Sequence, residues 1–229
     1  MYCCSWLCIF NRLAGHPENV CRKTGSKPLI IARNSYSRPS VQELLLAVSE
    51  ANAMGFLVAR NPFERLVSAY RDKILKSYWI DVAKEILAKY RKVIVPRYRV
   101  GRVAPTFKEF VTYVLDEFHA GNELDGHWAP VYNFCNPGQV TLTHIIKFET
   151  FDRDSHAILQ KANLSHLVPQ DKKFMKTNEN ASRGNQNSTL LVDSYLTELT
   201  PDLLDGIREL YSIDFDLFGY DKKENFQYV

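Results

Sequence analysis

Long hydrophobic runs are absent from this sequence. Its 229 residues contain no stretch of about 18 apolar residues, the length a helix needs to cross a bilayer. The apolar opening MYCCSWLCIF ends at Asn11 and Arg12 and is too short for that task. No transmembrane or targeting segment is therefore predicted within these residues.

Cysteine is scarce, and its spacing is not that of a metal site. The sequence has Cys3, Cys4, Cys8, Cys21 and Cys135, without the paired C-x-x-C motifs of structural zinc sites. No metal site is therefore predicted. The odd number is compatible with one or two disulfides, whose pairing the sequence leaves open.

An excess of charge of one sign is also lacking. The formal net charge is only +3, so nucleic acid is not the predicted partner, and an anionic ligand would need a local cluster of cations. The G-x-x-x-x-G-K-[ST] motif does not occur, which argues against a P-loop kinase. No internal repeat is visible, so a single domain over residues 1–229 is the simplest prediction.

The sequence can form a sizeable hydrophobic core, because 45% of its residues are hydrophobic. PLIIA at 28–32, FLVA at 56–59 and HIIKFE at 144–149 have the pattern of short buried strands. A capping box at Ser40 predicts a helix that extends to about Ala53. This alternation predicts an α/β fold, with a parallel sheet covered by helices.

The segment FLVARNPFERLVSAYRDK (56–73) passes from a predicted strand into a predicted helix. The Asn-Pro pair at 61–62 suits the cap and first position of that helix. Its polar face carries Arg65 and Ser68 within one turn of each other. Arg60, between strand and helix, is therefore either a phosphate ligand or part of a surface salt bridge.

A cluster of cations occupies residues 84–102. Against the single acid Glu85, this basic cluster contains Lys84, Lys89, Arg91, Lys92, Arg97, Arg99 and Arg102. It is either a solvated helix face or a site for an acidic polymer.

A turn-rich loop at 121–138 follows a helix that Thr106 begins with a second capping box. The loop contains His127, the best available general base, since an imidazole titrates near neutrality. His119 and His144 are the rival candidates, but the first follows a helix and the second opens a buried strand.

The later part of the chain carries sequence motifs typical of proteins in the secretory pathway. N-glycosylation sequons begin at Asn163, Asn180 and Asn187 and favour the secretory lumen. The polar stretch 170–189, which holds the last two, is predicted to be a mobile surface loop.

These motifs resemble a known family. RNPFERLVSAYRDK (60–73) is similar to the segment that binds the 3′-phosphate in Golgi carbohydrate sulfotransferases, the group with the chondroitin, dermatan and HNK-1 enzymes. The likeness continues through LDGHWAPVYNFC, IIKFET and LYSIDFDLFGYD, so it covers nearly the whole chain.

The opening CCSWLCIFNRLAG resembles the segment after the Pro-Lys pair of the family's 5′-phosphosulfate loop. That pair would lie just before Met1, and Leu7-Cys8 replaces the usual basic pair. We therefore expect either an N-terminally truncated sequence, lacking anchor, stem and the first part of the loop, or a protein that has lost a catalytic cation.

The resemblance implies a P-loop-like, PAPS-dependent sulfotransferase fold and a type II membrane protein of the Golgi lumen. PAPS (3′-phosphoadenosine 5′-phosphosulfate) would be the sulfuryl donor, without a metal. The acceptor would be a chondroitin- or dermatan-like glycosaminoglycan or a related glycan, held through the basic cluster. The membrane would be met only through an N-terminal anchor that this sequence does not contain.

The resemblance also implies roles for individual residues. Donor binding would fall to Cys3, Cys4, Ser5, Trp6, Arg60, Arg65 and Ser68. Arg65 has a second interpretation as the ion-pair partner of an acid such as Glu64 or Asp72. His127 would accept the acceptor's proton, and Lys176 and Arg183 would close over the donor. The alternative is a non-catalytic glycan- or nucleotide-binding relative that has lost the lysine of the Pro-Lys pair, the cation next to the leaving group.

Overall fold

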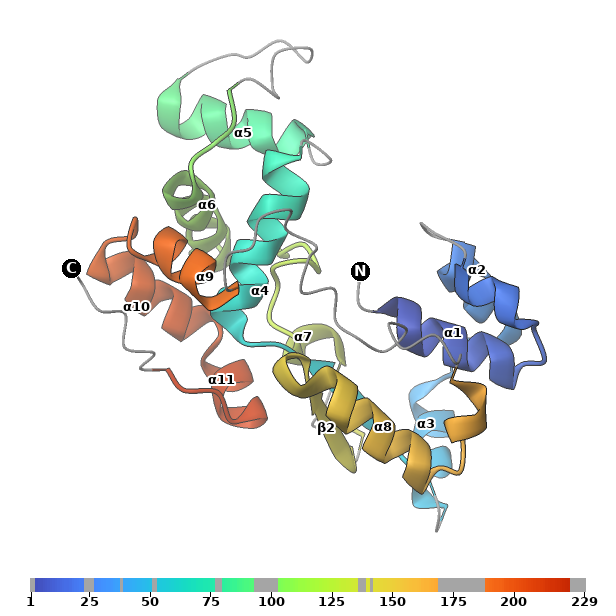
Figure 1. Ribbon diagram of the computed structural model, residues 1–229. Coiled ribbons are helices and arrows are strands. Elements are labelled where there is room, and N and C mark those ends of the chain that lie inside the picture. Colours follow the sequence, from blue (N-terminus) through green and yellow to red (C-terminus); the bar gives the residue numbers. More distant parts are fainter. Residues whose placement is uncertain are drawn as a thin grey trace. The chain divides into compact units, whose positions relative to one another are not determined.

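The computed structural model describes residues 3–22, 27–37, 39–50, 53–76, 80–92, 103–135, 139–140, 142–168 and 188–222. The chain forms two compact units (Figure 1). Unit 1 comprises Met1–Ala59 and Pro137–Arg183, and unit 2 comprises Arg60–Asn136 and Gly184–Val229. No helix in the described ranges is both long and apolar enough to span a membrane.

Unit 1 contains two parallel strands, β1 (Phe56–Ala59) and β2 (His144–Lys147). Its helices are α1 (Cys3–Leu13), η1 (Glu18–Arg22), α2 (Lys27–Ser35), α3 (Val41–Ser49), η4 (Phe148–Thr150), α8 (Phe151–Lys161) and η5 (Ser165–Leu167). The strand predicted at 56–59 is confirmed, as is the first part of that at 144–149. Both are only partly buried, since Ala59 and Ile146 are buried while Ile145 is 40% exposed. The parallel pairing confirms the α/β class.

The strand predicted at 28–32 is wrong, because these residues lie in helix α2. Pro28 and Ala32 are buried while Ile30 is 52% exposed, so burial follows the four-residue period of a helix. Proline is tolerated in a first helical turn, and the Pro28 carbonyl accepts a hydrogen bond from the buried Asn11 amide at 3.0 Å. Contact with α1, which five residues of sequence do not reveal, therefore supports this helix.

Trp6 of α1 lies in the core of unit 1. Its ring is 4.3 Å from that of Phe56 in β1, centroid to centroid, and its indole N–H donates to the Ser155 hydroxyl at 3.2 Å. Ile146 and Leu159, both fully buried, complete the same cluster. Helices α1 and α8 thus pack against the two strands.

Unit 2 is helical where it is described. Its helices are α4 (Pro62–Ala69), η2 (Tyr70–Leu75), α5 (Ile80–Arg91), α6 (Phe107–His119), α7 (Tyr132–Cys135), α9 (Ser188–Leu196), α10 (Pro201–Leu210) and α11 (Ser212–Phe218). The apolar stripe predicted from residue 63 onward is confirmed, since Phe63, Leu66 and Ile74 are almost fully buried. The stripe changes from α-helix to π-helix at Tyr70, which its spacing did not predict.

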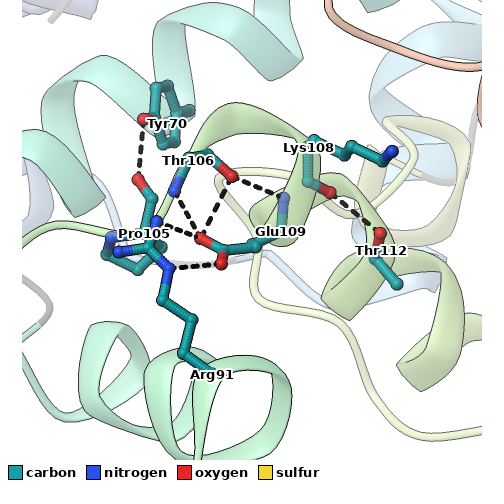
Figure 2. Close-up of polar contacts among 7 residues, drawn as sticks. All are labelled: Tyr70, Arg91, Pro105, Thr106, Lys108, Glu109 and Thr112. Atoms are coloured by element: carbon teal, nitrogen blue, oxygen red, sulfur yellow. Dashed lines mark hydrogen bonds and ion pairs between the residues drawn. The ribbon is translucent and has the colours of Figure 1, made fainter. Parts of the chain in front are cut away.

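Two helix starts follow the predicted capping boxes. At α3 the Ser40 hydroxyl accepts from the Glu43 N–H at 3.2 Å, and the Glu43 carboxylate accepts from the Ser40 N–H at 2.7 Å. Thr106 and Glu109 make the same exchange at α6, as Figure 2 shows. Helix α3 ends at Ser49, short of the predicted Ala53. Local side-chain chemistry therefore predicted where both helices begin, but not where α3 ends.

Candidate active site

Arg60 lies between the end of β1 and the start of α4. The Asn61 side chain caps α4 by accepting the Phe63 N–H at 2.9 Å, as predicted. The Arg60 guanidinium donates to the Glu64 carboxylate, with Nη2 3.2 Å from Oε2. The two side chains are only 17% and 16% exposed, so Glu64 holds this cation in place at the helix start.

Ser68 lies one turn after Glu64 on α4 and is half-buried. Glu64 and Ser68 are four residues apart on α4, and Arg60, which precedes the cap residue Asn61, reaches Glu64. Glu64, the partner of Arg60, thus precedes Ser68 by four residues on α4, the spacing of neighbouring side chains on a helix.

Arg65 contacts the loop that carries His127. Its Nη1 donates to the Ala129 carbonyl at 2.5 Å, and its Nη2 donates to the Gly126 carbonyl at 2.8 Å. Asp72, one of the acids considered as its partner, forms ion pairs with Lys73 and Lys76 at 3.0 Å. The fork of the guanidinium thus joins α4 to backbone on both sides of His127.

His127 lies in a tight turn formed by residues 125–128, called here the His127 turn. The Asp125 carbonyl accepts from the Trp128 N–H at 2.9 Å and the Ala129 N–H at 2.7 Å. Oδ1 of Asp125 accepts the His127 N–H at 2.8 Å and lies 2.6 Å from His127 Nδ1. A carboxylate only accepts, so Nδ1 carries the proton in this contact, and Nε2 is an acceptor whenever the ring is neutral.

Three buried residues fix the end of the turn and the backbone that follows it, namely Trp128, Tyr211 and Asp214. Trp128 packs edge-on against Phe110, and its carbonyl accepts the Tyr211 hydroxyl at 2.5 Å. The Asp214 carboxylate of α11 accepts from the Val131 N–H at 2.6 Å and the Tyr132 N–H at 3.0 Å. Tyr211 is fully buried and Asp214 is 2% exposed, so these hydrogen bonds are shielded from water.

Burial raises the pKa of the Asp214 carboxyl, although its two backbone N–H donors and the nearby Arg65 cation act in the opposite direction. Burial likewise raises the pKa of the Tyr211 phenol, which therefore stays protonated as a donor.

Sequence reasoning missed Asp125, Tyr211 and Asp214. The Asp-x-His spacing at 125–127 was a usable local signal for the first. An acid within the apolar run at 213–218 was a weaker signal for Asp214.

The 5′-loop residues lie at the start of α1 in unit 1. Helix α1 begins at Cys3, so the backbone N–H groups of Cys3, Cys4, Ser5 and Trp6 belong to its first turn. The Trp6 side chain is 5% exposed and packs in the core, so this residue can offer a ligand only its backbone.

Three cations in the described part of the basic cluster are paired with acids. Lys84 lies 3.5 Å from Asp81, and Lys89 lies 3.0 Å from Asp116, whose hydrogen bond raises the pKa of the lysine. Figure 2 shows the Arg91 guanidinium against the Glu109 carboxylate, with Nε 2.5 Å from Oε1. Lys92 follows α5.

Arg97, Arg99 and Arg102 of the basic cluster lie outside the described residues. The same is true of Lys176 and Arg183, and of the predicted loop at 170–189 except for Ser188 and Thr189, which begin α9.

The two rival histidines have other surroundings. His119 Nε2 lies 3.9 Å from a carboxylate oxygen of the exposed Glu209. His144 begins β2, as predicted, and its Nδ1 lies 2.8 Å from the Thr143 hydroxyl. His127 is the histidine whose carboxylate partner belongs to the same fixed turn. Within the described ranges, no group of three or more His, Cys, Asp or Glu side chains is placed to hold a metal ion.

Comparison with known proteins gives a family match. The profile of a family described as "Sulfotransferase family" matches residues 2–221. Carbohydrate sulfotransferase 9 of Homo sapiens is 33% identical over 164 residues, which are 70% of this chain and 36% of that protein. Carbohydrate sulfotransferase 11 of Mus musculus is 29% identical over 196 residues, 82% of this chain and 51% of that protein.

Carbohydrate sulfotransferase 10 of Xenopus laevis is 28% identical over 225 residues, 92% of this chain and 58% of that protein. The chain thus spans between 36% and 58% of the length of these three relatives. No solved structure gives a significant match.

Proposed function

The chain belongs to the sulfotransferase family, and from that premise we propose that it transfers a sulfuryl group from PAPS to a hydroxyl of a glycan. The acceptor proposed is a chondroitin- or dermatan-like glycosaminoglycan or a related glycan. The single observation that carries the proposal is the His127–Asp125 pair, held in a turn fixed from several sides.

The reaction makes three demands on the protein. PAPS supplies, when bound, an activated sulfuryl group on a phosphate leaving group. The chain's own residues must fix the donor, orient the acceptor hydroxyl and accept its proton.

His127 meets the last demand in this proposal. Its Nδ1–H donates to Asp125, so Nε2 is the atom that would accept the proton of the acceptor hydroxyl. The Asp125 carboxylate would then stabilise the imidazolium that forms. His127 is 45% exposed, so a glycan can reach it.

Arg65 would act as a positioning residue in this proposal. Its two hydrogen bonds, to the carbonyls of Gly126 and Ala129, fix the backbone on either side of His127. Since Arg65 shares α4 with Ser68, one helix would both position the loop that carries the base and supply part of the donor site.

Two places fit the anionic donor on the chemistry of their groups. Arg60, just before α4, offers a guanidinium and Ser68, on α4, offers a hydroxyl, and they would hold the 3′-phosphate. The first turn of the 11-residue helix α1 offers backbone N–H groups for the 5′-phosphosulfate. We propose that both units serve one catalytic domain.

The basic cluster is proposed to bind the anionic acceptor. Lys84, Lys89 and Arg91 are already paired with acids. We therefore assign the larger share of acceptor binding to Arg97, Arg99 and Arg102. Such binding would weaken as salt is added.

A Golgi-lumenal location is proposed as well. Cys8 is disulfide-bonded, which fits an oxidising compartment, and the sequon residue Asn163 is exposed. Both features are expected of a chain that passes through the secretory route.

The test is transfer of labelled sulfate from PAPS to desulfated chondroitin, desulfated dermatan and a terminal glucuronyl acceptor. We expect labelled product with at least one acceptor. Binding of PAPS without transfer to any acceptor would overturn the proposal and favour the non-catalytic relative. His156→Gln, a change on the exposed face of α8, serves as the activity control.

A further inference from the structure

A hollow of about 250 Å³ lies beside the His127 turn, within unit 2. Gly126, Ala129 and Pro130 line it, so residues on both sides of His127 bound this space. Its volume is just below the range of about 300–1,000 Å³ typical of small-molecule sites. The hollow therefore has room for one small ring rather than for several linked rings.

One edge of the hollow is fixed by the end of helix α6. Gly121 adopts a positive φ of 72°, and its N–H donates to the Phe118 carbonyl at 3.0 Å. The Asn122 N–H donates to the Glu117 carbonyl at 3.0 Å, and the Asn122 amide donates to the Glu117 carboxylate at 2.7 Å. This paired ending of the helix sets the edge before any ligand arrives.

The lining combines apolar surface with groups that form hydrogen bonds. Phe118, Leu124 and Leu210 contribute apolar side chains, and a sugar ring has C–H groups that pack on such surface. The polar side chains that line the hollow are Asn122, Glu123, Tyr132 and Asn133. Amides, a phenol and a carboxylate together can both donate to and accept from ring hydroxyls.

The charge of the lining selects among sugars. Among the described residues that form it, the one charged side chain is Glu123, and it is negative. A carboxylated or sulfated ring would be repelled there, whereas hydroxyls can donate to the carboxylate.

We propose that this hollow binds one uncharged sugar unit of the acceptor, next to the unit presented to His127. This inference rests on the proposed function, since it assigns part of the acceptor to a second place on the same unit. Charged units of an alternating glycan are then held outside the hollow, and the hollow sets the register of the chain.

The test is a binding measurement on the full chain, by saturation-transfer NMR. The probes are the methyl glycoside of N-acetylgalactosamine, which is uncharged, and methyl glucuronide, which is anionic. We expect the uncharged probe to bind, and Asn133→Ala and Glu123→Ala each to weaken it about tenfold, the loss expected for one hydrogen bond. Asn34→Ala, an exposed change on α2 in unit 1, should leave binding unchanged.

Equal affinity of the uncharged probe for the chain and both variants would overturn the inference, as would tighter binding of the glucuronide. Asn133 and Glu123 are exposed, so their variants are expected to fold. The readout does not depend on turnover. A chain that binds the uncharged probe through these residues but transfers no sulfate would support the hollow and overturn the proposed function.

Discussion

Nδ1 of His127 lies 2.6 Å from Oδ1 of Asp125, and the same oxygen accepts the His127 backbone N–H at 2.8 Å. One carboxylate oxygen therefore fixes both the turn and the tautomer of the ring. In this state Nε2 is the atom that can accept a proton.

Asp125→Asn is expected to lower kcat by about 10²–10⁴-fold, because an amide can present its N–H₂ to Nδ1 and favour the wrong tautomer. Sulfate transfer at saturating PAPS and acceptor measures this. Asp152→Asn, an exposed position on α8, is the matched control. An unchanged kcat in Asp125→Asn would remove the carboxylate from the account.

Arg60 and Arg65 are expected to affect different kinetic constants. Arg60→Met should raise the KM for PAPS by about 10–100-fold, since a charged hydrogen bond is worth about 1.5–3 kcal/mol. Arg65→Met should instead lower kcat by about tenfold or more and leave that KM unchanged, because a displaced base costs rate. A raised PAPS KM in Arg65→Met would make Arg65 a phosphate ligand.

Asp214→Ala is expected to destabilise the protein by about 2–4 kcal/mol, because it leaves two backbone N–H groups without their buried acceptor. Urea unfolding measures this loss of unfolding free energy. Asp216→Ala is the control on the same helix, since Asp216 is 70% exposed and pairs with Lys222. If both variants unfold at the same urea concentration, Asp214 does not hold this part of the chain.

Glu109→Gln tests the polar contacts of Figure 2 through the pH dependence of stability. Burial raises the pKa of Glu109, but hydrogen bonds from Arg91 and Thr106 outweigh it and hold the pKa below 4.5. The contribution of the carboxylate to the free energy of unfolding is therefore fully present above that value. It is lost as the pH falls through the pKa of Glu109 in the folded protein, which is lower.

We expect Glu109→Gln to cost about 1–2 kcal/mol at pH 7, and the difference from the unchanged chain to shrink as the pH falls below 4.5. Unfolding curves at neutral and acidic pH measure this. Glu209→Gln, at a 67% exposed side chain, is the control. A constant difference at all pH values would contradict the account.

The sequence predicted the elements whose signals are local. The Asn-Pro start of α4 and the capping boxes at Ser40 and Thr106 depend on neighbouring side chains, and all three are confirmed. The family resemblance found in residues 60–73 is confirmed by the family match. The run PLIIA was misassigned because five apolar residues do not distinguish a buried strand from a helix.

The partners of the site residues could not be predicted in the same way. Arg65 and Ala129 are 64 positions apart, and Val131 and Asp214 are 83 apart, so only the fold brings them together. The acids that pair with Lys89 and Arg91 likewise come from another helix, α6. A cation in a sequence is therefore not evidence of a ligand site until its partners are known.

The most direct test of the central claim is rescue of His127→Ala by free imidazole. The account predicts that kcat for sulfate transfer falls by about 10²–10⁴-fold in this variant, and that added imidazole restores part of it. Arg60→Met should show no such rescue, because its defect lies in donor binding. Turnover of His127→Ala at the unchanged rate would contradict the assignment of His127 as the base.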